Sequence, residues 1–144
     1  MSLKTWKATA CPVPASDAVA TELDAAQHCL RKWRSLTKKN LDKHGLQRDF
    51  CMLEGIATDE CFPINDRTCA LCIYNDNFEE CDSCILTQLR GVACDRQCDI
   101  TVKAPYVEFS QHGDPQPMIR LLRKAVKVLA GRVAQMVNKT HEAE

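Results

Sequence analysis

Four cysteines in two closely spaced pairs are the residues of this chain best suited to binding a metal ion. Cys69 and Cys72 are separated by two residues, eight residues follow, and Cys81 and Cys84 repeat the spacing. Each Cys-x2-Cys turn directs two sulfurs at one point, and two such turns complete a tetrahedral shell of four thiolates. Zinc suits this shell best because it binds soft thiolates without redox chemistry; iron is a weaker alternative. We therefore expect these four cysteines to hold one structural zinc ion.

Two other interpretations of the cysteines stay open. Ten cysteines in 144 residues could instead staple an extracellular domain with disulfides, or could be buried as free thiols. Residues 1–20 contain charged residues and two prolines, but no apolar run of signal-peptide length. No segment approaches the ~20 consecutive apolar residues that span a membrane. We therefore expect a cytoplasmic protein, with a secreted, disulfide-stapled protein as the alternative.

Six further cysteines lie outside the two pairs. Cys11 and Cys29 are isolated in the sequence, and we expect them to be buried thiols. The other four could form a second metal site around the first, or could be packed thiols: Cys51, Cys61, Cys94 and Cys98.

Residues that could perform catalysis are few. The histidines are scattered, and none stands in a His-x-Glu or His-Glu-x2-His motif: His28, His44, His112 and His141. The sequence has no glycine-rich phosphate loop and no Gly-x-Ser-x-Gly motif. The acidic residues beside the Cys-x2-Cys pairs fit a solvated loop. We therefore expect a protein that is not an enzyme.

Two long amphipathic helices are expected to position the cysteine-rich centre. Apolar residues recur at steps of three and four after a cap at Ser16 or Asp17, and Gly45 is a natural stop, which predicts a helix over 16–43. A second helix is predicted over 117–139. Its buried stripe consists of Met118, Leu122, Ala125, Leu129, Val133 and Met136, widened by Ile119, Val126 and Val137.

The remaining segments complete a mainly α fold with minor β structure. Residues 1–15 should be irregular because of Pro12 and Pro14. The cysteine-rich centre spans 49–114, with short helices expected at 49–55 and 82–91 and short strands at 100–103 and 106–109. Residues 16–144 should form a single domain in which the metal joins the flanking helices.

Charge is distributed in three blocks although the formal net charge is zero. Basic residues dominate 31–48 and 120–139, and acidic residues dominate 49–99. The blocks can attract one another in the fold, or the basic helices can form a face that contacts nucleic acid. The residues of that face would be Arg31, Lys32, Arg34, Lys38, Lys39, Arg120, Arg123, Lys124 and Lys127.

Part of the sequence resembles a known group of proteins. Two Cys-x2-Cys pairs, a cysteine ten residues later at Cys94, and the element Pro105-Tyr106-x2-Phe109 resemble small cysteine-rich proteins of tailed phages and prophages. Ile85 stands where that group usually has Pro, and Phe109 where it often has Trp. The resemblance implies a phage or bacterial cytoplasmic origin, and the group has no established activity.

These observations together predict a zinc-stapled interaction protein. We expect it to bind a protein partner through its helical surface, and it could also form an oligomer. Nucleic-acid binding through the basic helices is the alternative.

Overall fold

The structure, a computed structural model, describes residues 3–46, 64, 68–75, 84–91 and 104–143. Within these residues every regular element is helical, which confirms the mainly α prediction. The elements are α1 (Leu3–Ala10), the 3₁₀ turn η1 (Ala15–Asp17), α2 (Glu22–Arg34), α3 (Lys38–Lys43), α5 (Ala70–Tyr74), α6 (Ile85–Arg90), α7 (Pro105–His112) and α8 (Gln116–Ala143). The expected helix at 49–55 and strand at 100–103 lie outside the described residues.

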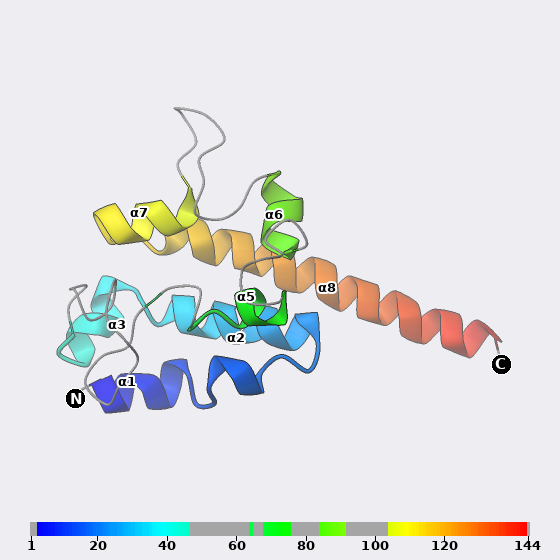
Figure 1. The fold of residues 1–144 in the computed structure, drawn as a ribbon, viewed down its shortest axis with the longest axis horizontal. Helices are drawn as coiled ribbons and strands as arrows, with labels where there is room; N and C mark the ends of the chain where they lie inside the picture. Colours follow the sequence, from blue (N-terminus) through cyan, green and yellow to red (C-terminus); the bar gives the residue numbers. More distant parts are fainter. Residues whose placement is uncertain (1–2, 47–63, 65–67, 76–83, 92–103, 144) are drawn as a thin grey trace.

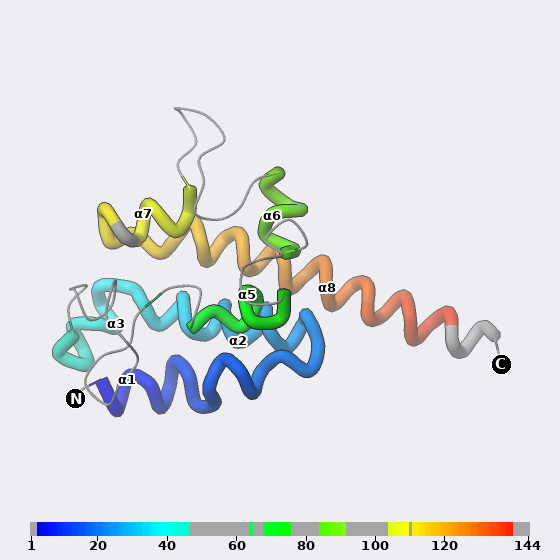
Figure 2. The backbone as a smooth tube through the Cα atoms, viewed as in Figure 1, coloured from blue at the N-terminus to red at the C-terminus, as the bar shows by residue number. Residues whose placement is uncertain are grey.

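Helix α2 is the centre of the fold. It packs most extensively against α8, and also against α5 and α1. Figure 1 shows α1 on the side of α2 that faces away from α8, and α6 and α7 beside α8. Figure 2 shows that α1 and η1 run alongside α2, and that the chain then reverses direction to enter α2. No helix of the described segments is both long enough and apolar enough to cross a membrane.

The prediction that residues 1–15 are irregular is wrong, because α1 forms within them. Trp6 and Ala10, four residues apart on one face of α1, are completely buried. The indole Nε1 of Trp6 donates a hydrogen bond to the carbonyl of Ser35, at 2.8 Å. Pro12 lies beyond the last helical residue, so it ends the helix without preventing it.

The single helix predicted over 16–43 is also wrong, because the structure has two helices there. The first of them, α2, begins at Glu22, where the Thr21 hydroxyl caps it by accepting the backbone N–H of Asp24 at 3.0 Å. Between α1 and Thr21 the only helical element is η1, so the predicted caps at Ser16 and Asp17 do not start the helix.

The break between α2 and α3 is stabilised by two side chains, one from α1 and one from α3. The Ser35 carbonyl, which a continuous helix would use internally, accepts hydrogen bonds from Trp6 Nε1 and Asn40 Nδ2, each at 2.8 Å. Thr37 then caps α3 by accepting the backbone N–H of Asn40 at 3.3 Å. The predicted stop is confirmed: Gly45 has a φ of 69° just after α3.

Residues 106–109, predicted to be a strand, are part of α7. Pro105 occupies the first turn, where its missing N–H costs nothing, and Gly113 ends the helix in the left-handed conformation. As a helix, the segment directs Phe109 and Tyr106 at Trp33 of α2, with ring centroids 5.1 and 6.4 Å away in edge-to-face geometry. These aromatic contacts join α7 to α2 across the core.

The C-terminal helix predicted over 117–139 is confirmed as α8, although its buried stripe is shorter than expected. Between Met118 and Leu129 the stripe is buried except at Val126, which is partly buried. Beyond it Val133, Met136 and Val137, predicted to be buried, are 46%, 68% and 50% exposed.

The helix predicted over 82–91 is confirmed in part, since α6 spans Ile85–Arg90 and ends at Gly91 with a φ of 87°.

Candidate functional site

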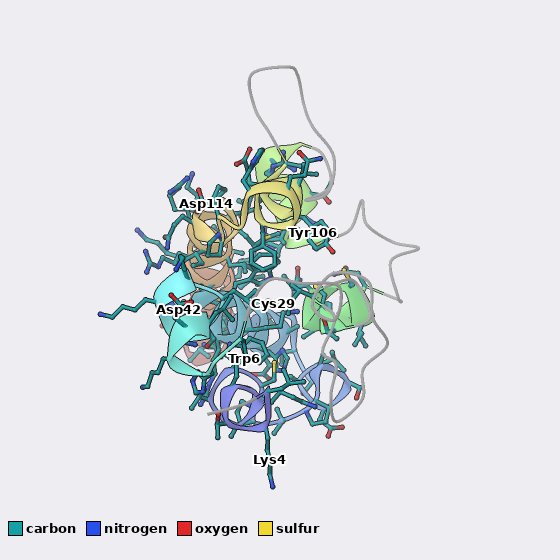
Figure 3. All side chains as sticks on the ribbon, turned by 90° about the vertical axis from the view of Figure 1, so that its left-hand side faces the viewer. Lys4, Trp6, Cys29, Asp42, Tyr106 and Asp114 are labelled. Atoms are coloured by element: carbon teal, nitrogen blue, oxygen red, sulfur yellow. The ribbon has the colours of Figure 1, made fainter. Side chains whose placement is uncertain are left out.

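Two features of the described residues could carry a function: a cluster of thiols between α2 and α5, and the exposed C-terminal part of α8. In the thiol cluster, the Sγ of Cys29 lies 3.7 Å from the Sγ of Cys69. Cys29 is buried on α2 and Cys69 immediately precedes α5, so the contact joins two elements that are 40 residues apart in sequence. Figure 3 shows Cys29 in the interior of the molecule.

The first Cys-x2-Cys pair forms a local turn around the sulfur of Cys69. The backbone N–H of Cys72 donates to the Cys69 Sγ at 3.4 Å. Hydrogen bonds from the thiols of Cys29 and Cys72 hold the pKa of Cys69 well below its usual value, and the charge of Lys32 acts in the same direction. The shared hydrogen bond and burial raise the pKa of Cys29 well above its usual value. The two buried sulfurs are therefore close enough to share one proton.

Lys32 is a buried cation next to this cluster. Its side chain is only 1% exposed, and its Nζ donates a 2.6 Å hydrogen bond to the carbonyl of Thr68, the residue before Cys69. Lys32 cannot contact a nucleic acid from this position, so it does not belong to the predicted basic face. Its charge instead lowers the pKa of Cys69.

Cys84, the residue before α6, is the third predicted zinc ligand that the structure describes. It is half-buried and packs against the core. Burial raises the pKa of Cys84 to about 11, and the charge of Cys69 also raises it.

The zinc site predicted at Cys69, Cys72, Cys81 and Cys84 stays a prediction. Among the residues that the structure describes, no three His, Cys, Asp or Glu side chains are gathered in a way that would hold a metal ion. Cys81 lies outside these residues, as do all four cysteines of the expected second site: Cys51, Cys61, Cys94 and Cys98.

The two isolated cysteines have different surroundings. The expectation of burial is confirmed for Cys29, whereas Cys11 is only half-buried. Burial raises the pKa of Cys11, and the charge of Lys32 opposes this rise. Sequence reasoning missed the contact of Cys29 with Cys69, because no local spacing relates residues 29 and 69.

Two of the histidines have contacts within the fold. The Nδ1 of His44 and the hydroxyl of Thr5 are 2.9 Å apart, which connects the end of α3 to α1. His28 is buried, with its Nε2 2.9 Å from the Val13 carbonyl. This oxygen can only accept, so Nε2 carries the proton, and burial lowers the pKa of His28.

The second feature is the C-terminal arm of α8, which we define as residues 130–143. Figure 1 shows this part of the helix projecting beyond the other elements. Every residue from Ala130 to Lys139 is exposed. At 1.5 Å per residue the arm is roughly 20 Å long.

All residues of the predicted basic face except Lys32 are exposed, although two of them have contacts within the chain. On α8 the basic residues are exposed, as are Arg34 and Lys39 near the end of α2 and in α3. Arg31 donates from Nε to the Thr9 carbonyl at 2.7 Å. Lys38 forms a 2.8 Å ion pair with Asp42.

Comparison of the chain with protein-family models, with curated proteins and with solved structures gave no match. The resemblance to small phage proteins therefore stays a prediction.

Proposed function

We propose that this chain is an interaction protein whose α8 arm binds an acidic amphipathic helix of another protein. The observation that supports this most strongly is the apolar stripe of α8, which continues onto the exposed arm. Val133 and Val137 are about half exposed, and Met136 is 68% exposed. Side chains at such i, i+3 and i+4 positions are the anchors by which helices bind in grooves or pair with one another.

The exposed residues lie on the face of α8 that packs against the body. Successive residues of an α-helix are turned by 100°, so Leu122, Leu129 and Val133 fall within roughly 40° of one another. Leu122 and Leu129 are buried in the core. A partner helix placed along the arm would therefore continue the packing that α2 and α6 provide on the N-terminal part of α8.

Charge indicates the chemistry of the partner. No acidic residue occurs between Asp114 and Glu142, whereas six basic residues do. On the arm, Arg132 and Lys139 are seven residues apart and lie along the same flank of the stripe. A partner with acidic residues beside its apolar positions would meet opposite charges, as at the e and g positions of a coiled coil.

Two other occupants of the arm fit it less well, an identical arm because of its charges and nucleic acid because of the apolar stripe. In a pair of identical arms, Arg132 and Lys139 of one chain would face basic residues of the other, and like charges are destabilising. Nucleic acid would use the basic flanks but would leave Val133 and Val137 in water. The burial of Lys32 also removes one cation from the proposed phosphate-binding set. An acidic helix uses both the stripe and its flanks.

A synthetic peptide can test this proposal with the full chain. The probe is a fluorescein-labelled peptide of about three heptads with leucine at a and d and glutamate at e and g. Binding is followed by fluorescence anisotropy. The double variant V133S/V137S should weaken binding about 30-fold, since losing roughly 1 kcal/mol of apolar burial at each half-exposed valine totals about 2 kcal/mol. Serine and valine have similar helix propensities, so the arm stays helical.

A matched control lies on the opposite side of the arm. Gln135 and Asn138 are exposed and point away from the stripe by helical geometry, so Q135S/N138S should bind the peptide like the parent chain. Equal loss in both double variants, or no peptide binding by the parent chain, would contradict the proposal. So would dimerisation through the arm in sedimentation equilibrium, or tight binding of a labelled DNA duplex that V133S/V137S does not change.

A further inference from the structure

The distance between the sulfurs of Cys29 and Cys69 has a specific meaning in metal chemistry. In a tetrahedral zinc–thiolate shell with bonds of about 2.3 Å, two sulfurs stand ~3.8 Å apart. The observed separation is 3.7 Å. Two packed thiols can also stand this far apart, and the groups around the pair distinguish a metal site from simple packing.

A third thiol belongs to the same cluster. Cys72 follows Cys69 at the spacing typical of metal-binding turns, and its backbone N–H donates to the Cys69 sulfur at 3.4 Å. The sulfurs of Cys29 and Cys69 are therefore in contact, with Cys72 in the turn that follows. Cys84 immediately precedes α6 and, like Cys69, packs against the core.

The buried lysine supports an anionic group at this point. Placing an ammonium in the interior costs several kcal/mol unless it is compensated. Among the carboxylates that the structure describes, none forms an ion pair with Lys32. A zinc ion with four thiolates carries a net charge of −2, and the charge of Lys32 beside Cys69 would offset part of it.

We propose that Cys29, Cys69, Cys72 and Cys84 bind one thiophilic divalent metal ion that connects α2 with α5 and α6. This set replaces Cys81 of the Cys-x2-Cys prediction with Cys29. The described side chains are not gathered into a metal-binding group as they stand. Metal binding is coupled to the ordering of its ligands, so the ion draws Cys72 and Cys84 toward the preformed Cys29–Cys69 edge. The site is independent of the proposed role of α8.

The test uses the reduced full chain, with zinc and cobalt(II) as probes. One equivalent of metal should bind, and the cobalt form should show thiolate-to-metal charge transfer of a four-sulfur tetrahedral site. C29S should lower the charge-transfer intensity by about a quarter, as one of four thiolates is lost. It should also weaken zinc binding more than ~100-fold, since even outer-shell substitutions cost 10–100-fold. C11S is the matched control and should change neither property.

Cysteine-by-cysteine alkylation of the parent chain keeps the test valid if C29S does not fold. After chelation Cys29, Cys69, Cys72 and Cys84 should all react more readily than in the zinc-loaded protein, while Cys11 should react equally in both. The proposal fails if C29S retains parental affinity and charge-transfer intensity while C81S loses them. It also fails if no metal binds, or if peptide mapping finds a Cys29–Cys69 disulfide in protein purified without reductant.

Discussion

Replacing Trp6 with phenylalanine tests whether α1 is an integral part of the core. Trp6 is completely buried, and its indole N–H reaches the Ser35 carbonyl at the break between α2 and α3. Phenylalanine loses this hydrogen bond, which contributes about 1 kcal/mol. It also leaves a cavity of roughly 40 Å³, which at ~24 cal/mol per Å³ costs about 1 kcal/mol more. W6F should therefore lower the free energy of unfolding by about 2 kcal/mol.

The measurement is urea denaturation followed by far-ultraviolet circular dichroism, with the free energy obtained by linear extrapolation. K4A is the matched control on the same helix, because Figure 3 shows Lys4 directed away from the body whereas Trp6 lies against it. An exposed substitution of this kind should change stability by less than ~0.5 kcal/mol. If W6F and K4A had equally small effects, α1 would not be docked as described.

Two further substitutions test local features of the helices by the same method. T21A removes the hydroxyl that caps α2 at the backbone N–H of Asp24 and should cost about 1 kcal/mol; T21S, which keeps the hydroxyl, should cost far less. G131A should stabilise the chain by about 0.5–1 kcal/mol, because Gly131 lies within α8 and a Cβ there meets nothing within 4 Å. A destabilising G131A would indicate that the arm is not helical or that its surface at Gly131 is covered.

The parts of the fold that local sequence controls were predictable. Proline marks the start of α8, glycine follows α3 and α6, and the apolar period of α8 is long and regular. The break after Arg34 was not predictable, because it depends on Trp6 reaching the Ser35 carbonyl from α1. The strand predicted at 106–109 failed for a similar reason: alternating residues over four positions also fit one turn of a helix, which Pro105 starts and Phe109 anchors.

For the candidate site, sequence spacing identified Cys69 and Cys72 but not their neighbour. The approach of Cys29 arises from the packing of α2 against α5, which no local motif encodes. The burial of Lys32 could not be predicted from the sequence either. This lysine occurs in a run of basic residues that resembles a solvated surface, yet it is buried beside the thiols. Val133 and Val137 were identified correctly as part of the apolar stripe, but the sequence could not show that the stripe continues beyond the body.

A charge exchange between the arm and its ligand tests the proposed function most directly. The variant R132E/K139E reverses both charges that flank the stripe while leaving Val133 and Val137 in place. It should bind the glutamate peptide at least 10-fold more weakly than the parent chain does. It should also bind a peptide with lysine in place of each glutamate more tightly than the parent chain does. If the parent chain and R132E/K139E bound both peptides equally, the arm would not recognise an acidic helix.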